Sequence, residues 1–292
     1  MSPTWKPIEP LSDEDRNTDL KDIESLKEAW AEVKTRLGET SKENLQKFSE
    51  RLARLWSIET GILERLYDVD RGTTAILVEQ GFVAAYIDRS GTDQDPEHLI
   101  EILRDHKATV ELIQDCVANS RPLTIGFIHE LHSILTQHQA NVSGVDQFGK
   151  RVSFPLLRGR FKESPNNPTR ENGTVHEYCP PIHVPSDMDR LLVLYSEYDS
   201  ENPVLLSAWL HHRFEQIHPY QDGNGRVGRA LSNLVLVKAG LFPVVVKRDQ
   251  RGEYIHALEE ADAGNLHSLT RLFANIQKKT ILEAISVAPD TK

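Results

Sequence analysis

The stretch HPYQDGNGRVGR, residues 218–229, holds an imidazole, a carboxylate, two guanidinium groups and three glycines within twelve positions. Pro219 disfavours the right-handed helical conformation at the residue before it. A helix is therefore expected to end near Ile217, with His218 directly after its C-terminus. Gly223 and Gly225 permit a tight loop whose N–H groups close around an anion. The pattern therefore predicts an anion-binding turn that ends a helix.

The side chains of this stretch predict which anion the turn binds. A second helix is expected to begin near Arg226 and to point its free N–H groups at the same anion. Arg226 and Arg229 lie three positions apart, so two guanidinium groups on one helix face can reach two phosphates of a polyphosphate. Asp222 suits Mg²⁺, which commonly takes one or two carboxylates together with phosphates and water. His218 has the pKa of a general base at neutral pH.

Three other interpretations remain for the same residues. D-x-N-G is half of a calcium-loop pattern, although Arg226 stands where a further ligand is required. His211, Glu215 and His218 lie near one helix face and could bind zinc, although the helix end at His218 disturbs that spacing. An ordinary Asx-Gly turn with two surface arginines is the third interpretation.

The stretch resembles the core pattern of the Fic (Fido) family, H-x-F-x-[D/E]-G-N-G-R-x-x-R, from which it departs only in Tyr220. Residues 208–217 also resemble the helix that precedes this pattern. The resemblance implies transfer of AMP from Mg-ATP to a Ser, Thr or Tyr hydroxyl of a protein, which could be the chain itself. It implies the following roles: His218 takes the hydroxyl proton, Asp222 holds Mg²⁺, Gly223, Asn224 and Gly225 cradle the phosphates, and Arg226 and Arg229 grip the β- and γ-phosphates.

Further residues are assigned by position within the family. Tyr254 and Asp262 fall where residues contact the nucleoside, although Tyr254 could equally be a core side chain. The long irregular region 139–174 should contain the family's flap, a hairpin within residues 161–178. Thr174, Val175 and His176 are the expected strand positions, where a target would add as a strand. The alternative is a disordered insertion.

An N-terminal segment resembles the family's inhibitory pattern, [S/T]-x-x-x-E-[G/N]. Residues 60–64 read TGILE, and Arg65 replaces the final small residue. Helical spacing places Thr60 above Glu64, so the hydroxyl is expected to orient the carboxylate. Glu64 is then expected to pair with Arg229. Glu59 is the fallback residue if the register shifts, and a solvated helix glutamate is the alternative.

Hydrophobic periodicity predicts an all-α fold, and the family implies a helical bundle with a small β-hairpin flap. His132 is interpreted as structural. We divide the chain into a helical region 1–122 with the inhibitory segment, a Fic core 123–285 and a tail 286–292. Expected elements are helices over 20–37, 41–55, 56–67, 73–82, 96–118, 125–136, 186–198, 203–217, 230–239, 251–263 and 266–285, and a strand-like link over 242–246.

Composition excludes several classes of function. The 292 residues include 34 basic and 44 acidic side chains, and the net charge of −10 opposes nucleic-acid or anionic-membrane binding. No secretory signal or membrane-length apolar run is visible, and Cys116 and Cys179 have no paired spacing, so a cytoplasmic protein without disulfides is expected. A homodimer is left open.

Two rival functions remain. The same loop could remove AMP or transfer another phosphate-containing group. The chain could instead be an inactive nucleotide-binding regulatory module, although the intact His218 and Asp222 argue against this.

Overall fold

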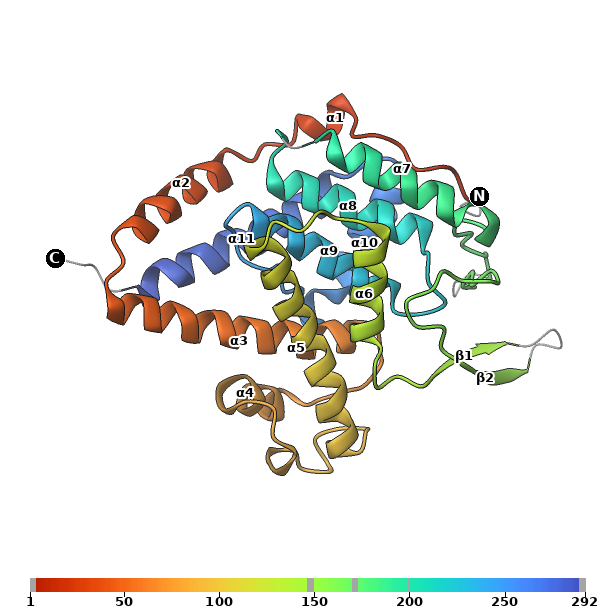
Figure 1. Ribbon diagram of the computed structural model, residues 1–292, viewed down its shortest axis with the longest axis horizontal. Helices are drawn as coiled ribbons and strands as arrows, with labels where there is room; N and C mark the ends of the chain where they lie inside the picture. Colours follow the sequence, from red (N-terminus) through yellow and green to blue (C-terminus); the bar gives the residue numbers. More distant parts are fainter. Residues whose placement is uncertain (1–3, 146–149, 170–172, 199, 289–292) are drawn as a thin grey trace.

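The computed structural model describes residues 4–145, 150–169, 173–198 and 200–288. These residues form eleven α-helices and one two-stranded antiparallel sheet, so the predicted all-α fold is confirmed (Figure 1). The helices are α1 (Asp13–Arg16), α2 (Lys21–Thr35), α3 (Glu39–Leu63), α4 (Arg71–Gln80), α5 (Pro96–Ala118), α6 (Ile125–Leu135), α7 (Val184–Ser196), α8 (Pro203–Ile217), α9 (Asn224–Lys238), α10 (Arg251–Asp262) and α11 (His267–Val287). No helix in the described ranges is both long and apolar enough to cross a lipid bilayer.

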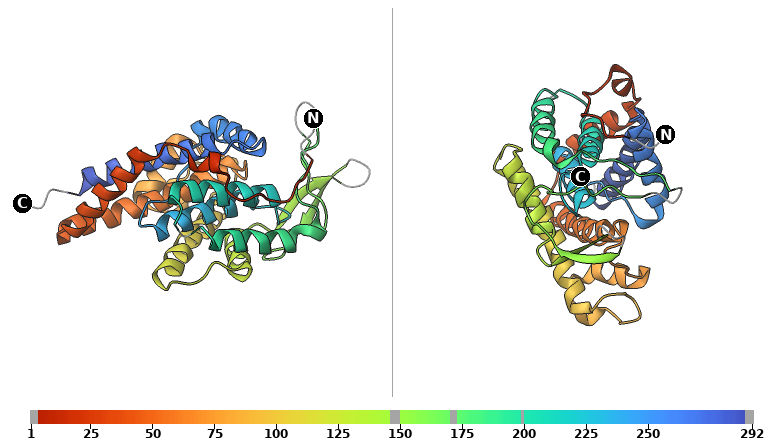
Figure 2. Two further views of the ribbon diagram at one scale, coloured as in Figure 1. Left: turned by 90° about the horizontal axis from the view of Figure 1, so that it is seen from above. Right: turned by 90° about the vertical axis from the view of Figure 1, so that its right-hand side faces the viewer.

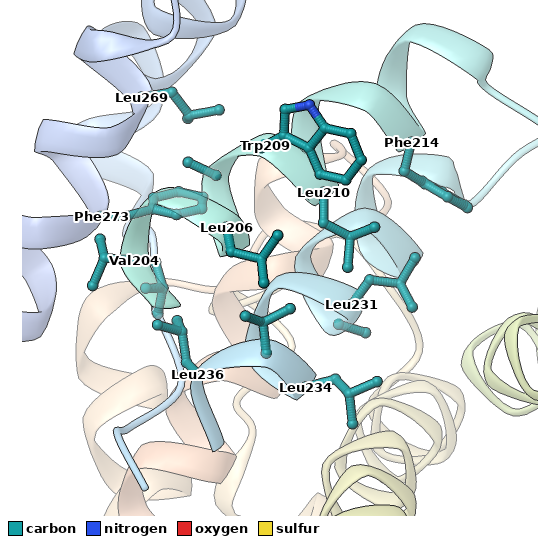
Figure 3. Close-up of a cluster of buried hydrophobic side chains, with 14 of the residues drawn as sticks. Val204, Leu206, Trp209, Leu210, Phe214, Leu231, Leu234, Leu236, Leu269 and Phe273 are labelled. Carbon is teal, nitrogen blue, oxygen red and sulfur yellow. The ribbon is translucent and has the colours of Figure 1, made fainter. Parts of the chain in front are cut away.

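Helices α8 and α9 form the centre of the molecule, on either side of the loop 218–223. Both are buried on nearly every face, because α7 and α11 pack against α8 while α5 and α6 pack against α9. Figure 3 shows apolar side chains from α8, α9 and α11 filling the space between these helices. Each such buried side chain contributes about 1.5–3 kcal/mol, so the core holds the two ends of the loop 218–223 in place.

Residues 39–63 form one continuous 25-residue helix, where the sequence predicted two. In Figure 1, α3 runs as the long orange helix from the left edge to the centre of the molecule. It packs against α4, α5, α9 and α11, and its last two turns are largely buried. Glu64 follows as the C-cap, which brings it beside the start of α9.

The main hydrophobic cluster contains side chains from both the 1–122 region and the 123–285 region. A second, smaller cluster joins the end of α3 to α4 and α5, with Ile58, Tyr67 and Leu99 among its members. The division into two regions stays a prediction. Residues 289–292 of the predicted tail lie outside the described residues.

Two predicted helix starts are wrong by two residues. Helix α7 begins at Val184, and the Ser186 hydroxyl donates to the carbonyl of His183 at 2.9 Å instead of capping the helix. Helix α9 begins at Asn224 because Gly223 adopts a left-handed conformation and itself serves as the N-cap. The start of α8 is confirmed, since the Asn202 side chain accepts from the N–H of Val204 and Pro203 occupies the first turn.

The regular hairpin lies earlier in the chain than the flap was predicted. Strands β1 (Asn141–Val145) and β2 (Arg151–Pro155) pair with Gly144 opposite Val152. Figures 1 and 2 show them at one end of the molecule, opposite the turn between α2 and α3. Within 161–178, the described residues contain one isolated antiparallel bridge, Thr169 to Val175, and the hydrogen bond from the N–H of His176 to the carbonyl of Pro168.

The predicted strand-like link over 242–246 is buried but pairs with no strand among the described residues. Side-chain amides take the place of a neighbouring strand. Asn233 accepts from the N–H of Val244 at 2.7 Å, and Gln277 hydrogen-bonds to both backbone polar groups of Phe242. These contacts satisfy backbone groups that burial would otherwise leave unpaired.

Candidate active site

Helix α8 ends at Ile217, as predicted from Pro219. The N–H of His218 still donates to the carbonyl of Phe214 at 2.9 Å, but His218 adopts φ 50° and ψ 60°. We expected an extended residue before proline, and the left-handed conformation differs from that expectation. This conformation costs a non-glycine residue roughly 1–2 kcal/mol, and such strained positions cluster at functional sites.

The glycines of the loop allow a close approach that no larger residue permits. Gly223 has φ +81°, and a Cβ at Gly225 would lie 2.1 Å from Oε1 of Glu64. No side chain among the described residues caps the N-terminus of α9. The first turn of a 15-residue helix therefore presents N–H donors and its positive dipole end, which is a favourable site for an anion.

The imidazole of His218 is half-buried and lies between an aromatic ring and two amides. The Tyr178 ring stacks on it at 3.8 Å with an interplanar angle of 4°. Nδ1 of His218 receives hydrogen bonds from the amides of Asn166 at 2.9 Å and Asn224 at 3.1 Å. Burial lowers the pKa of His218 well below its ordinary value, and the charges of Lys162 and His176 lower it further. The ring is therefore neutral at pH 7, as a general base must be.

Asp222 and Arg226 are joined by a residue that the sequence did not single out. The Gln139 amide donates to Oδ2 of Asp222 at 2.5 Å and accepts from Nη2 of Arg226 at 2.7 Å. Arg226 is 1% exposed, and its Nε and Nη1 have no hydrogen-bond partner among the described residues. A buried guanidinium with unpaired N–H groups is suited to an anionic ligand.

Arg229 makes the pair that the sequence predicted. Its Nη1 lies 2.7 Å from Oε1 of Glu64 and 3.3 Å from the Tyr254 hydroxyl. Burial opposes the charge, but the neighbouring Glu64 carboxylate and the Tyr254 hydroxyl raise the pKa of Arg229 above its ordinary value. Thr60 holds the remaining edge of the guanidinium, accepting from Nε at its hydroxyl (2.9 Å) and from Nη2 at its carbonyl (3.0 Å).

The expected role of the Thr60 hydroxyl therefore needs correction. It orients the arginine rather than Glu64, because Glu64 lies past the last helical turn as the C-cap. The fallback residue Glu59 is not part of the site. Its carboxylate pairs with Arg248 at 2.8 Å and accepts from the backbone N–H of the same residue.

Tyr254 and Asp262 lie at different depths. Tyr254 is 3% exposed, and its hydroxyl contacts Nε2 of His211 at 2.6 Å. Asp262 at the end of α10 is exposed at the surface, with one carboxylate oxygen 3.1 Å from Nε2 of His212 and the other 3.8 Å from Nδ1 of His176. The structure thus brings the expected flap residue His176 next to Asp262.

His132 is structural, as interpreted. Its Nε2 contacts the carbonyl of Asp222 at 3.0 Å, its Nδ1 accepts from the N–H of Gly159 at 2.9 Å, and its ring stacks on Tyr220 at 3.8 Å. These contacts connect His132 to the backbone of Asp222 and to the Tyr220 ring, and so stabilise the loop 218–223. The zinc and calcium interpretations find no support, since the described residues contain no group of three or more His, Cys, Asp or Glu side chains placed to hold a metal.

Sequence reasoning missed Gln139, Lys162, Asn166 and Tyr178. All four lie in or beside the long irregular region, where no periodicity or local motif indicates which side chains turn inward. The one available signal was the unusual length of that region, which is typical of functional loops.

Comparison with known proteins supports the family resemblance. The profile of the Fic/DOC family matches residues 122–236. A protein adenylyltransferase Fic of Drosophila willistoni is 38% identical over 108 residues, covering 34% of this chain and 22% of that protein. Its counterpart in Nematostella vectensis is 26% identical over 187 residues, covering 62% of this chain and 38% of that protein. The chain thus aligns with less than half the length of these relatives.

Solved structures share the fold. A Fic domain containing signaling protein from Bacteroides thetaiotaomicron superposes with a TM-score of 0.73 at 24% identity, covering 91% of this chain and 96% of that one. A Fic family protein from Desulfovibrio desulfuricans superposes with a TM-score of 0.65 at 22% identity, covering 99% and 79%. Residues 122–236 thus match the Fic/DOC family, and the described chain shares its helical fold with these two Fic-domain structures.

Proposed function

We propose that this chain is a protein adenylyltransferase that transfers AMP from Mg-ATP to a Ser, Thr or Tyr hydroxyl of a protein target. The observation that carries the proposal is a neutral imidazole, His218, beside a helix N-terminus flanked by two buried arginines. The names of the relatives, protein adenylyltransferases Fic, support the same reaction.

The chemical step assigns the base to His218. The target hydroxyl gives its proton to the imidazole while its oxygen forms a bond to the α-phosphorus of ATP. The bond from that phosphorus to its bridging oxygen breaks, and pyrophosphate leaves. A positioned base of this kind contributes about 10²–10⁴ in rate.

The polyphosphate is held by fixed positive groups. The first turn of α9, which begins with Asn224 and Gly225, would face the phosphates with its N–H donors, and the unpaired N–H groups of Arg226 would bind an oxygen. Gly223, the N-cap, lets the backbone turn closely around the phosphates, while its own N–H donates to the Asp222 carboxylate. Asp222 has one partly exposed carboxylate, which fits Mg²⁺ because this ion takes its remaining ligands from phosphates and water. When bound, Mg²⁺ supplies further positive charge to the polyphosphate.

Arg229 has a second role in this proposal. Its guanidinium would bind the γ-phosphate, but Glu64 and Thr60 occupy it. ATP then binds with its α-phosphate displaced from the in-line geometry, and a misplacement of about 1 Å can cost roughly 10²-fold in rate. Glu64 therefore restrains the enzyme.

The flap and the nucleoside contacts complete the proposal. Val175 forms the bridge with Thr169 and its side chain is 40% exposed, so residues 174–176 are the segment beside which an extended target strand would add. Asp262 lies next to His176 and would contact the ribose or base. Tyr254 is buried with its hydroxyl on His211 and Arg229, which favours the core role that the sequence left open for it.

The test compares two positions of the label in ATP. Glu64→Gly protein is incubated with a target lysate and ATP labelled at the α- or the γ-phosphate. Adenylyl transfer labels protein from the α-position only. Labelling from the γ-position would indicate phosphoryl transfer, and nucleotide binding with no labelling from either position would indicate a regulatory module.

A further inference from the structure

Two side-chain amides converge on one ring nitrogen of His218. The Asn166 amide donates to Nδ1 at 2.9 Å and the Asn224 amide at 3.1 Å, and both also donate to the carbonyl of Tyr220 at 2.8 Å. Asn224 is the first residue of α9, within the stretch 218–229. Asn166 comes from the irregular segment between β2 and α7.

The orientation of each amide is determined by a different partner. Oδ1 of Asn224 accepts from the backbone N–H of Tyr220 at 2.8 Å, so its amino group must face the ring. Oδ1 of Asn166 accepts from Nζ of Lys162 at 2.8 Å, and an ammonium group only donates. Reversing either amide would place two donors or two acceptors against each other. Nδ1 of His218 is therefore a hydrogen-bond acceptor.

Lys162 is buried, and both its backbone and its side chain contact the site. It is 3% exposed, its backbone N–H donates to the carbonyl of Pro219 at 2.8 Å, and its Nζ lies 5.7 Å from the centre of the Tyr178 ring that stacks on His218. Burial lowers the pKa of Lys162 to about 8, so the group still carries its charge through most of the neutral range.

These contacts disfavour a charged imidazole. An imidazolium would present an N–H at Nδ1 to two amide donors, and its charge would face Lys162 and His176. The Tyr178 ring covers one face of His218 and offers no carboxylate to pair with an imidazolium. A neutral ring with Nδ1 as acceptor carries its proton on Nε2.

We propose that Asn166, oriented by Lys162, is a positioning residue that keeps His218 neutral and in the tautomer with its proton on Nε2. This inference rests on the proposed function only in assigning His218 as the base. A target hydroxyl that gives its proton to Nδ1 takes over the position of the Asn166 amide.

The test replaces the amide donor by an acceptor of the same shape. Asn166→Asp places a carboxylate against Nδ1, and an opposite charge at this distance raises the pKa of a histidine by about one to three units. Asn167→Asp is the matched control, because it adds the same charge one residue away at an exposed position. Lys162→Met removes the ammonium without adding charge.

The readout is the titration and tautomer of His218, followed by NMR on ¹⁵N-labelled histidine. In wild type and in Asn167→Asp, we expect the His218 imidazole to remain neutral, with its proton on Nε2, down to low pH. Asn166→Asp should titrate at least one pH unit higher, with Nδ1 protonated. Lys162→Met should move the titration in the same direction by less.

A second readout uses label transfer in the Glu64→Gly background. In Asn166→Asp, the apparent pKa of the acid limb of the pH–rate profile should increase by the same amount as the pKa of His218 measured by NMR. KM for ATP should stay unchanged. Equal titrations in Asn166→Asp and Asn167→Asp, or Nδ1 protonated in the wild type, would overturn the inference. A shifted titration without any label transfer would support the positioning of His218 and reject the proposed reaction instead.

Discussion

Releasing Arg229 from Glu64 should activate the protein by roughly one to two orders of magnitude. At 2.7 Å, two unit charges attract by about 6 kcal/mol at an effective dielectric constant of about 20. Solvent reaches Glu64, whose side chain is 35% exposed, and screening leaves about 1.5–3 kcal/mol, the range for a hydrogen bond to a charged group. A γ-phosphate must displace this interaction, and about 1.4 kcal/mol corresponds to tenfold.

The assay compares label incorporation from α-labelled ATP by wild type and Glu64→Gly at the same Mg-ATP concentration. Glu59→Gln is the matched control, because Glu59 lies on the same helix end and pairs with Arg248 instead. ATP should also raise the melting temperature of Glu64→Gly more than that of wild type, since stabilisation by a ligand grows with the logarithm of its affinity for the folded state. The reasoning is refuted if Glu64→Gly is no faster than wild type, or if the Glu59 variant is equally fast.

Three further predictions concern stability. Arg65 has φ 55°, so Arg65→Gly should raise the free energy of unfolding by about 1 kcal/mol in urea, whereas Arg65→Ala should give no gain. Gly228→Ala should lower it by about 1–3 kcal/mol, because a Cβ there would lie 2.5 Å from Glu215 and 2.8 Å from His211. Gly126→Ala is the helical control and should not destabilise, because a Cβ there would lie 3.7 Å from its nearest neighbour, the Thr124 hydroxyl oxygen. Burial raises the pKa of Glu215 to about 8, so the folded protein binds the extra proton and stability falls as pH rises from about 4.5 to 8. Glu215→Gln should reduce the slope of the free energy of unfolding against pH by up to about 1.4 kcal/mol per pH unit across this range. An unchanged slope would show that Glu215 is not protonated in the folded protein.

The parts of the site that follow local rules could be predicted from the sequence. The end of α8 at Ile217 follows from Pro219, and the pairing of Glu64 with Arg229 was expected from the family pattern. The contacts of Asn166 and Gln139 were not predicted, because they join residues 52 and 83 positions apart through a region without periodicity. Such contacts depend on how the helices pack.

The fold shows the same division. Every long amphipathic helix was expected, but the 25 residues of α3 were divided in two, because residues 56–63 are buried on most faces and lose the helical stripe that marks a surface helix. The hairpin β1–β2 was missed. A five-residue strand that includes Gly144 carries little of the alternation by which strands are recognised.

The central claim is that the protein transfers AMP with His218 as the base, and intact-mass analysis of Glu64→Gly protein incubated with Mg-ATP and a target tests it most directly. The account predicts protein species heavier by one AMP, with pyrophosphate released in equal amount. In the Glu64→Gly, His218→Ala double variant the adduct should form at least about 10²-fold more slowly, while ATP binding measured by calorimetry persists. Formation of the AMP adduct at an undiminished rate without His218 would contradict the account.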